Sequence, residues 1–242
     1  MEELEGAIYN LKKESAPGPD FFFNELFING GEEIKRKLLD IINQSWEQGV
    51  LPMEWRRANV IFLKKLNKTN YNLLSSYRPI SLTRVVVKMM ERIIKFRLEA
   101  FVERFHILDA EQEGFRYFRS TINALLSLTQ DIFNGFNMSK STAAIFIDFE
   151  KAYDSVWREE LMVKLSRSGV RGNMWNWINA FLSHREARCI VNDHTGVWFQ
   201  TSIGLPQGSV ISPILFNILT LLQTAVSLQM MLLYGTQWKT DS

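Results

Sequence analysis

The chain has 242 residues, of which 46% are hydrophobic and 22% are charged, a composition that excludes a disordered polar segment and is typical of one large folded domain or two small ones. Its single cysteine, Cys189, excludes an internal disulfide framework and fits a reducing compartment inside the cell, nuclear or cytoplasmic. The acidic N-terminus, MEELE, lacks the basic and apolar stretches of a secretory signal.

The basic residues are unevenly distributed, although the net charge is only +2. Residues 54–104 carry twelve Lys and Arg side chains against four Asp and Glu side chains. This excess predicts that a polyanion, such as a nucleic acid, binds the segment. The alternative is a solvated helix face, because Arg84, Lys88, Arg92 and Lys95 recur at helical spacing and would line one exposed side.

The first part of the chain predicts two amphipathic helices separated by a helix-breaking turn. Residues 1–14 place their apolar side chains at helical spacing on one face. Residues 15–20, SAPGPD, contain two prolines and a glycine and cannot continue that helix. The helical pattern resumes over residues 31–48, and Gly49 stands where a left-handed C-terminal cap is expected.

A pair of strands is predicted next. Residues 55–63 and 75–82 contain short apolar stretches on either side of a polar turn. We expect the two strands to pair as an antiparallel hairpin, with Lys64, Lys65 and Arg78 near its tip. The hairpin would therefore present a cluster of three cations at one end.

Helices dominate the remainder of the chain. Helical periodicity and capping residues predict four of them, at residues 83–105, 120–136, 155–168 and 172–183. Residues 188–191 and 197–202 read as the strands of a further hairpin around a glycine-containing turn. A loop bounded by glycines, GLPQGS at residues 204–209, then opens a final helix.

The stretch from Ala143 to Ile147 has five consecutive apolar residues and predicts a strand buried on both faces. Asp148 follows at the C-terminal end of that strand, where open α/β sheets usually carry ligands. A carboxylate in that position suits a hard cation, which prefers oxygen ligands. The alternative is that Asp148 caps the helix that follows, and this stretch taken alone favours the cap.

Five short stretches occur in one order along the chain. They are SAPGPD (15–20), YRPISL (77–82), QEGFRYFRST (112–121), IDFEKAYD (147–154) and GLPQGSVISP (204–213). Together they resemble the reverse transcriptases of non-LTR (LINE-type, jockey-like) retrotransposons. Each stretch is a weak signal by itself, so the resemblance depends on all five together. Phe21 departs from the family pattern, which usually has glycine after Pro-Gly-Pro-Asp.

The resemblance implies an α+β fold, with the fingers and an incomplete palm of a right-hand polymerase, an antiparallel sheet packed with helices, and no thumb. It divides the chain into a fingers-like region (1–140), a partial palm (141–220) and an aberrant tail (221–242). The implied activity is that of an RNA-directed DNA polymerase, which adds deoxynucleotides to a DNA primer on an RNA template. The implied cofactor is Mg²⁺ or Mn²⁺, acting by two-metal-ion catalysis. No membrane partner is expected.

The resemblance also implies roles for individual residues. Asp148 would be catalytic and, with the carbonyl group of Phe149, would hold a metal ion. Asp154 would serve the helix rather than the metal. The implied nucleotide-binding residues are Lys64, Lys65, Arg78, Tyr153, Gln207 and Gly208. Among these, Tyr153 would exclude ribonucleotides by clashing with the 2′-hydroxyl group, and Lys64 or Lys65 with Arg78 would clasp the triphosphate.

Several of these residues have a purely structural alternative. Tyr153 would then be a core aromatic residue and Gln207 a turn residue. Lys64 and Lys65 would only keep the hairpin soluble. The family pattern favours the functional interpretation, most strongly for Asp148.

The family's second metal-binding motif, an aromatic-Ala-Asp-Asp turn, should follow Asn217. Residues 219–234 contain no acidic residue at all. Met230 and Met231 are ATG codons, and the third base of one read with the first two of the next gives GAT, an aspartate codon; we therefore interpret the tail as frameshifted. No endonuclease is expected before the fingers. We expect this chain to be inactive as a polymerase, and the alternative function is a non-catalytic nucleic-acid-binding remnant that uses the basic fingers.

Overall fold

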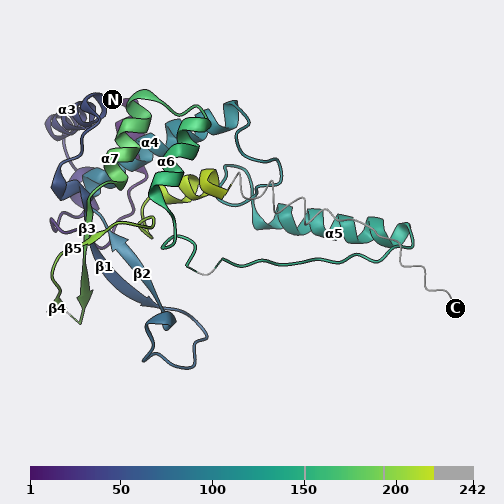
Figure 1. Ribbon diagram of the computed structural model, residues 1–242. Helices are drawn as coiled ribbons and strands as arrows, with labels where there is room; N and C mark the ends of the chain where they lie inside the picture. Colours follow the sequence, from purple (N-terminus) through teal and green to yellow (C-terminus); the bar gives the residue numbers. More distant parts are fainter. Residues whose placement is uncertain (150, 193, 221–242) are drawn as a thin grey trace.

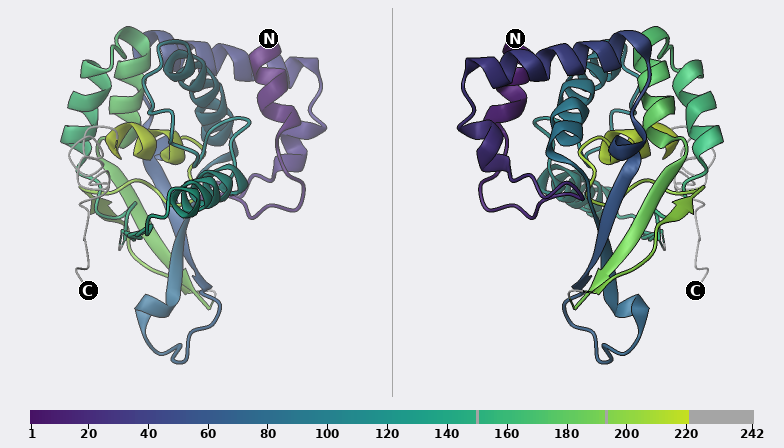
Figure 2. Two further views of the ribbon diagram at one scale, coloured as in Figure 1. Left: turned by 90° about the vertical axis from the view of Figure 1, so that its right-hand side faces the viewer. Right: turned by 90° about the vertical axis from the view of Figure 1, so that its left-hand side faces the viewer.

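The computed structural model describes residues 1–149, 151–192 and 194–220. They form a helical body from which a long β-hairpin and one isolated helix extend (Figures 1 and 2). A sheet packs against helices, which confirms the expected mixed α and β class. Within the residues described, no helix is both long enough and apolar enough to cross a membrane.

The longer helices agree closely with those expected from periodicity, whereas the first helix ends at Tyr9 and not near residue 14, and the short helix at residues 24–28 was not predicted. They are α1 (Glu2–Tyr9), α2 (Asn24–Ile28), α3 (Glu32–Gln48), α4 (Val85–Arg104), α5 (Thr121–Asn137), α6 (Arg158–Arg167) and α7 (Gly172–Leu182), with single turns η1 (Met53–Arg56) and η2 (Leu74–Ser76). Residues 212–220 are also helical and follow the glycine-bounded loop. Gly49 ends α3 with a left-handed φ of 62°, as expected for a C-terminal cap.

The strands are β1 (Arg57–Lys64), β2 (Tyr77–Leu82), β3 (Arg185–Val191), β4 (His194–Thr195) and β5 (Phe199–Thr201). The expected hairpin is confirmed, because β1 and β2 pair in antiparallel register. β3 pairs antiparallel with β4 and with β5, and it pairs in parallel with β1. The parallel pair joins the first quarter of the chain to its last quarter, across the domain boundary expected near residue 140. That boundary stays a prediction.

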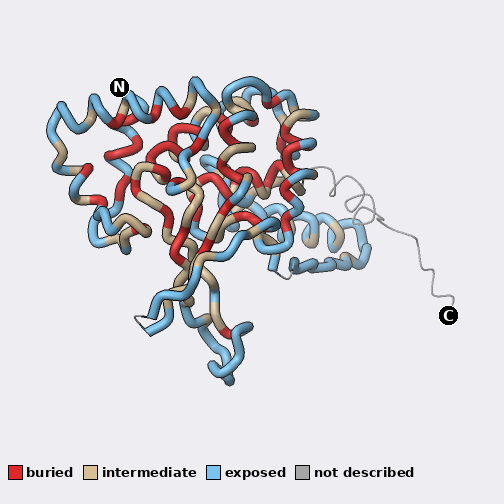
Figure 3. The backbone as a smooth tube through the Cα atoms, turned by 60° about the vertical axis from the view of Figure 1, so that its left-hand side comes forward, coloured by how far each residue is buried: buried red, intermediate tan, exposed pale blue. Residues whose placement is uncertain are grey.

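The hydrophobic core lies in the helical body and contains residues from Leu4 to Ile218. In Figure 3 the buried backbone is concentrated there, whereas the hairpin tip and α5 are exposed. At its centre Trp177 stacks on Phe181, with ring centroids 5.3 Å apart and both side chains fully buried. This stack fixes α7 within the core.

The strand expected at residues 143–147 is wrong. These residues form no strand, and Ile145, Phe146 and Ile147 are exposed. They follow α5, a helix without any buried residue, and the chain runs back below it (Figure 1). An apolar run becomes a buried strand only where a neighbouring strand forms hydrogen bonds with its backbone. No described strand pairs with residues 143–147.

Two further expectations concern α4 and the tail. Arg84, Lys88, Arg92 and Lys95 are all partly exposed, so the solvated helix face stays a prediction. The frameshift interpretation concerns residues 221–242, which lie outside the described residues.

We expect Phe181→Ala to lower the free energy of unfolding by about 3–5 kcal/mol, because the substitution leaves a cavity beside Trp177. Phe136→Ala on α5 is the matched control, since that ring is exposed. The control should change stability by less than about 0.5 kcal/mol. Urea unfolding measures both, and an equal loss in the two variants would contradict this assignment of the core.

Candidate nucleotide site

The loop at residues 204–209 is fixed by backbone hydrogen bonds to two other parts of the chain. The N–H of Gly204 donates to the carbonyl of Val156 (2.8 Å), and the N–H of Leu205 donates to the carbonyl of Tyr153 (2.7 Å). On the other side, the N–H of Ser81 in β2 donates to the carbonyl of Gln207 (2.7 Å). Three of the five motif stretches are therefore in contact at this loop.

Gly208 lets the loop lie close to β2. A Cβ atom at this position would be 3.1 Å from Cγ2 of Ile80 and 3.2 Å from the carbonyl oxygen of Ser81. Its φ of 101° is also strained for any residue with a side chain. A larger residue would therefore move Gln207 away from the hairpin.

Tyr153 lies under the loop and is half-buried. Its ring stacks on Phe216, with centroids 5.2 Å apart and an interplanar angle of 25°. Burial raises the pKa of its phenol above the ordinary value. This packing agrees with the core-aromatic alternative, and the contact with a nucleotide sugar stays a prediction.

A cavity of about 280 Å³ lies between this loop and the sheet. Its wall includes Asp154 and Gln207 as well as Phe62, Pro79 and Phe199. The wall also includes Arg158, Arg185 and Glu186, so apolar and charged residues line the cavity together.

Neither Asp154 nor Asp148 caps the helix that follows, although the sequence analysis gave each of them a role at a helix start. The N-cap residue of α6 is Trp157, so Asp154 does not cap this helix and instead lines the cavity. The cap alternative for Asp148 is also wrong, because α6 begins ten residues later. The sequence analysis placed the start of this helix at residue 155, but residues 151–155 form a turn and α6 begins only at Arg158.

The three hairpin cations are not equivalent. Nζ of Lys64 lies 5.3 Å from the ring centroid of Tyr71, and Nζ of Lys65 donates to the carbonyl of Ser75 (3.0 Å). The side chain of Arg78 is exposed and, within the described part of the chain, makes no hydrogen bond or ion pair. Of these three cations, Arg78 is therefore the one whose side chain is free for an anionic ligand in the described structure.

The proposed metal ligands do not assemble with the loop. Asp148 and Phe149 are exposed on the extended segment that follows α5. Across the described residues, no group of three or more His, Cys, Asp or Glu side chains lies close enough to hold a metal ion. The described residues thus do not fit a two-metal site, which needs several oxygen ligands around a pair of ions.

Glu91 on α4 is a positioning residue that the sequence analysis missed. Its carboxylate is fully buried and accepts hydrogen bonds from the hydroxyl of Ser209 and from the N–H groups of Val210 (2.6 Å) and Ile211 (3.3 Å). It thereby satisfies donors at the start of the helical residues 212–220. Burial raises the pKa of Glu91, against the attraction of the buried Arg185 guanidinium.

Arg158 holds the other end of the loop. Its guanidinium donates to the carbonyls of Leu182, Thr201, Ile203 and Gly204 and to the hydroxyl of Thr201. Burial lowers the pKa of this arginine. A single basic residue at a helix start gave no signal of such a role in the sequence.

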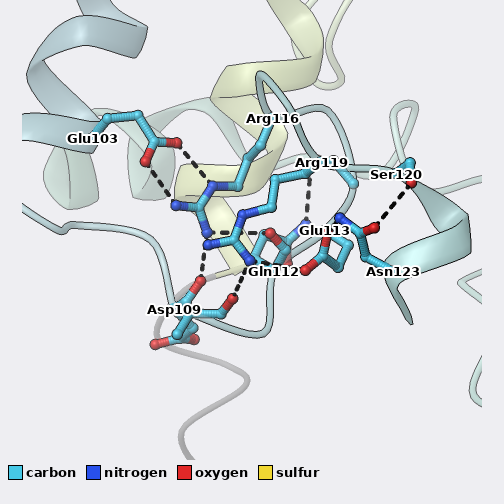
Figure 4. A network of polar contacts seen from close by, with 10 residues as sticks. Glu103, Asp109, Gln112, Glu113, Arg116, Arg119, Ser120 and Asn123 are labelled. Atoms are coloured by element: carbon cyan, nitrogen blue, oxygen red, sulfur yellow. Dashed lines mark hydrogen bonds and ion pairs between the residues drawn. The ribbon is translucent and has the colours of Figure 1, made fainter. Parts of the chain in front are cut away.

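The QEGFRYFRST stretch is ordered by the polar network in Figure 4. Arg116 makes a bidentate ion pair with Glu103 of α4 (2.8 and 2.7 Å), and Arg119 pairs with Glu113 (2.8 Å). The buried Asn217 donates to the carbonyl of Gly114 (2.8 Å). These contacts dock the stretch on α4 and on the helical residues 212–220.

Comparisons with known proteins match the same region. A family model described as "Reverse transcriptase (RNA-dependent DNA polymerase)" matches residues 64–225. The chain is 29% identical over 220 residues to "Probable RNA-directed DNA polymerase from transposon BS" of Drosophila melanogaster. It is 28% identical over 218 residues to "RNA-directed DNA polymerase from mobile element jockey" of the same species.

These alignments cover 91% and 90% of this chain but 24% of each relative. The chain therefore spans about a quarter of the length of these curated relatives. A solved structure, "Partial Cas6-RT-Cas1--Cas2 complex", is 14% identical, with a TM-score of 0.46 over 95% of this chain and 34% of that one.

We expect Glu91→Gln to remove a pH dependence of stability. Burial raises the pKa of Glu91 in the folded chain above its ordinary 4.5. As the pH rises, the Glu91 carboxyl group therefore ionises at a lower pH in the unfolded chain than in the folded chain. The wild type therefore loses stability from about pH 4.5 up to the raised pKa, and glutamine, which does not titrate, abolishes this loss.

The measurement is Tm between about pH 4 and pH 7. The Tm of the wild type minus that of Glu91→Gln should fall as the pH rises. Met90→Leu, a neighbouring buried substitution that introduces no titratable group, is the control. A difference between wild type and Glu91→Gln that stays constant with pH would contradict the prediction.

Proposed function

The chain belongs to the reverse transcriptase family, and from this premise we propose that it supplies the fingers and part of the palm of an RNA-directed DNA polymerase of a non-LTR retrotransposon. Its partners would be an RNA template, a DNA primer and deoxynucleoside triphosphates. The observation that carries the proposal is the contact of three motif stretches at one loop. Ser81, Gln207 and Tyr153 come from distant parts of the sequence and are joined there by backbone hydrogen bonds.

Gln207 and Gly208 would meet the incoming nucleotide. The hydrogen bond from Ser81 fixes the backbone of Gln207 against β2, and the absence of a side chain at Gly208 keeps that distance short. Tyr153, packed on Phe216, is the residue proposed to contact the sugar. A ring held rigidly on one side would discriminate against a ribose 2′-hydroxyl by steric exclusion.

The hairpin tip would bind the triphosphate. Arg78 lies opposite Leu63 in the β1–β2 register and has its guanidinium free in the described structure, as a bidentate phosphate ligand requires. Lys64 and Lys65, which interact with Tyr71 and Ser75, would add positive charge beside it.

Asp148 and the carbonyl group of Phe149 are the proposed ligands of a divalent cation, Mg²⁺ or Mn²⁺. Such an ion would supply electrophilic stabilisation of the phosphates. Residues 219–234 provide no carboxylate, and the described residues form no metal-binding cluster. We therefore assign this 242-residue chain nucleotide and template binding but negligible polymerisation.

In a primer-extension assay on an RNA template with Mg²⁺ or Mn²⁺, we expect the chain to give no product above background. Asp148→Ala should behave like the wild type for that reason. An active reverse transcriptase from another source serves as the positive control. Extension by the wild type that Asp148→Ala abolishes would refute the proposed inactivity and would support Asp148 as a metal ligand.

Arg78→Gln should weaken dATP binding by about tenfold or more, because a charge-assisted hydrogen bond contributes about 1.5–3 kcal/mol. Lys68→Gln, an exposed residue in the same hairpin turn, removes the same charge and should change the affinity less than about twofold. Competition against a fluorescent deoxynucleotide measures both. Equal affinities in the two variants would exclude Arg78 as the phosphate ligand.

A further inference from the structure

Helix α5 carries large apolar side chains on its surface. None of its 17 residues is buried, and the helix extends away from the helical body (Figures 1 and 3). Five of its apolar side chains are each 57–65% exposed: Ile122, Leu125, Leu126, Phe133 and Phe136. Large apolar side chains that gather on a surface mark a place where another molecule binds.

The five side chains share one face of the helix, which we call the α5 apolar face. With 3.6 residues per turn they fall within an arc of about 100°, the width of the apolar stripe of a helix that packs against a partner. Asp131, the only charged residue of α5, lies on the opposite face. Two such apolar faces can therefore meet without burying an unpaired charge.

The apolar residues are spaced symmetrically about Thr129. Ile122 and Phe136 each lie seven positions from Thr129, on either side of it. Leu125 and Phe133 each lie four positions from it. If two copies of α5 pack antiparallel about a two-fold axis at Thr129, the α5 apolar face of one copy therefore matches that of the other. Self-complementarity of this kind is what a two-fold interface requires.

Thr129 suits the position on the axis. Its hydroxyl donates to the carbonyl of Leu125 (2.8 Å), so it needs no further partner in an apolar contact. Its side chain is also shorter than those of the apolar residues around it, and short side chains at a helix crossing let two helices approach closely.

The area of the α5 apolar face is sufficient for a dimer. Each of its five side chains leaves on the order of 100 Å² exposed, which gives on the order of 500 Å² per copy. Two copies would thus bury on the order of 1,000 Å², the area that a specific interface has to reach. The polar residues around the face would add to this area.

We propose that α5 is a dimerisation helix and that a second copy of this chain covers its apolar face, packed antiparallel about a two-fold axis at Thr129. The symmetric spacing favours a second copy over an unrelated protein. A lipid surface is disfavoured, because helices that lie on membranes carry Lys and Arg on their polar face and α5 contains neither. The proposal goes beyond the proposed function and uses no residue of the nucleotide site.

The first test measures the dimer by sedimentation equilibrium of the full chain. Leu125→Glu combined with Phe133→Glu should raise the dissociation constant of the dimer at least about a hundredfold, because the two-fold axis places each new carboxylate twice in an apolar contact. Both side chains are exposed in the single chain, so the far-UV circular dichroism should not change.

The matched control adds the same charge to the opposite face of α5. Ser127→Glu combined with Asn134→Glu changes two exposed residues and should alter the dissociation constant less than about threefold. Phe136→Ala should raise it about tenfold, although it hardly changes unfolding in dilute solution, where the chain is monomeric.

The second test locates the axis. Thr129→Cys in a Cys189→Ser background, which lacks the native cysteine, should form a disulfide-linked dimer on mild oxidation. Residues on the axis of a close helix pair come within the Cα distance of about 4.4–6.8 Å that a disulfide needs. Ser127→Cys in the same background is the control and should stay monomeric on a non-reducing gel.

Several outcomes would overturn the proposal. A wild type that stays monomeric at about 0.1 mM would show that no second copy covers the face. Monomers that bind phosphatidylcholine vesicles through α5 would show that lipid covers it instead. Equal weakening of the dimer in the two double glutamate variants would place the interface elsewhere. Equally fast cross-linking of Ser127→Cys and Thr129→Cys would exclude the axis at Thr129.

Discussion

A buried carboxylate determines how the two ends of the chain meet. Glu91 on α4 receives hydrogen bonds from Ser209, Val210 and Ile211, so the first half of the chain holds the start of the helical residues 212–220. A buried charge is costly without donors around it. All three donors reach Oε2 of Glu91, so this one oxygen holds the segment that directly follows Gln207 against α4.

The position of the loop depends on three supports, of which Gly208 is itself a proposed nucleotide-binding residue. Arg158 fixes the backbone before the loop, Glu91 fixes the backbone after it, and Gly208 keeps the contact with β2 short. Polar side chains buried in this way specify a geometry more than they add to stability. The exposed side chain of Arg78 is then free to contact a ligand from a fixed frame.

Unlike the loop, α5 and residues 143–149 are not held in place by buried side chains. Their side chains are exposed because the described residues offer no helix or strand against which they could pack. Asp148 belongs to this segment and is exposed as well. Exposed apolar area of this extent favours association.

The sequence by itself determined the family, the helices and the β1–β2 hairpin with Arg78 near its tip, because motif order, periodicity and turn residues are properties of short stretches. Only the tertiary structure decided which residues meet. Glu91 and Ser209 are 118 positions apart, and no local pattern reveals such a contact. The exposed run at 143–147 has the same cause: its apolar residues could predict a strand, but burial requires a partner that lies elsewhere in the chain.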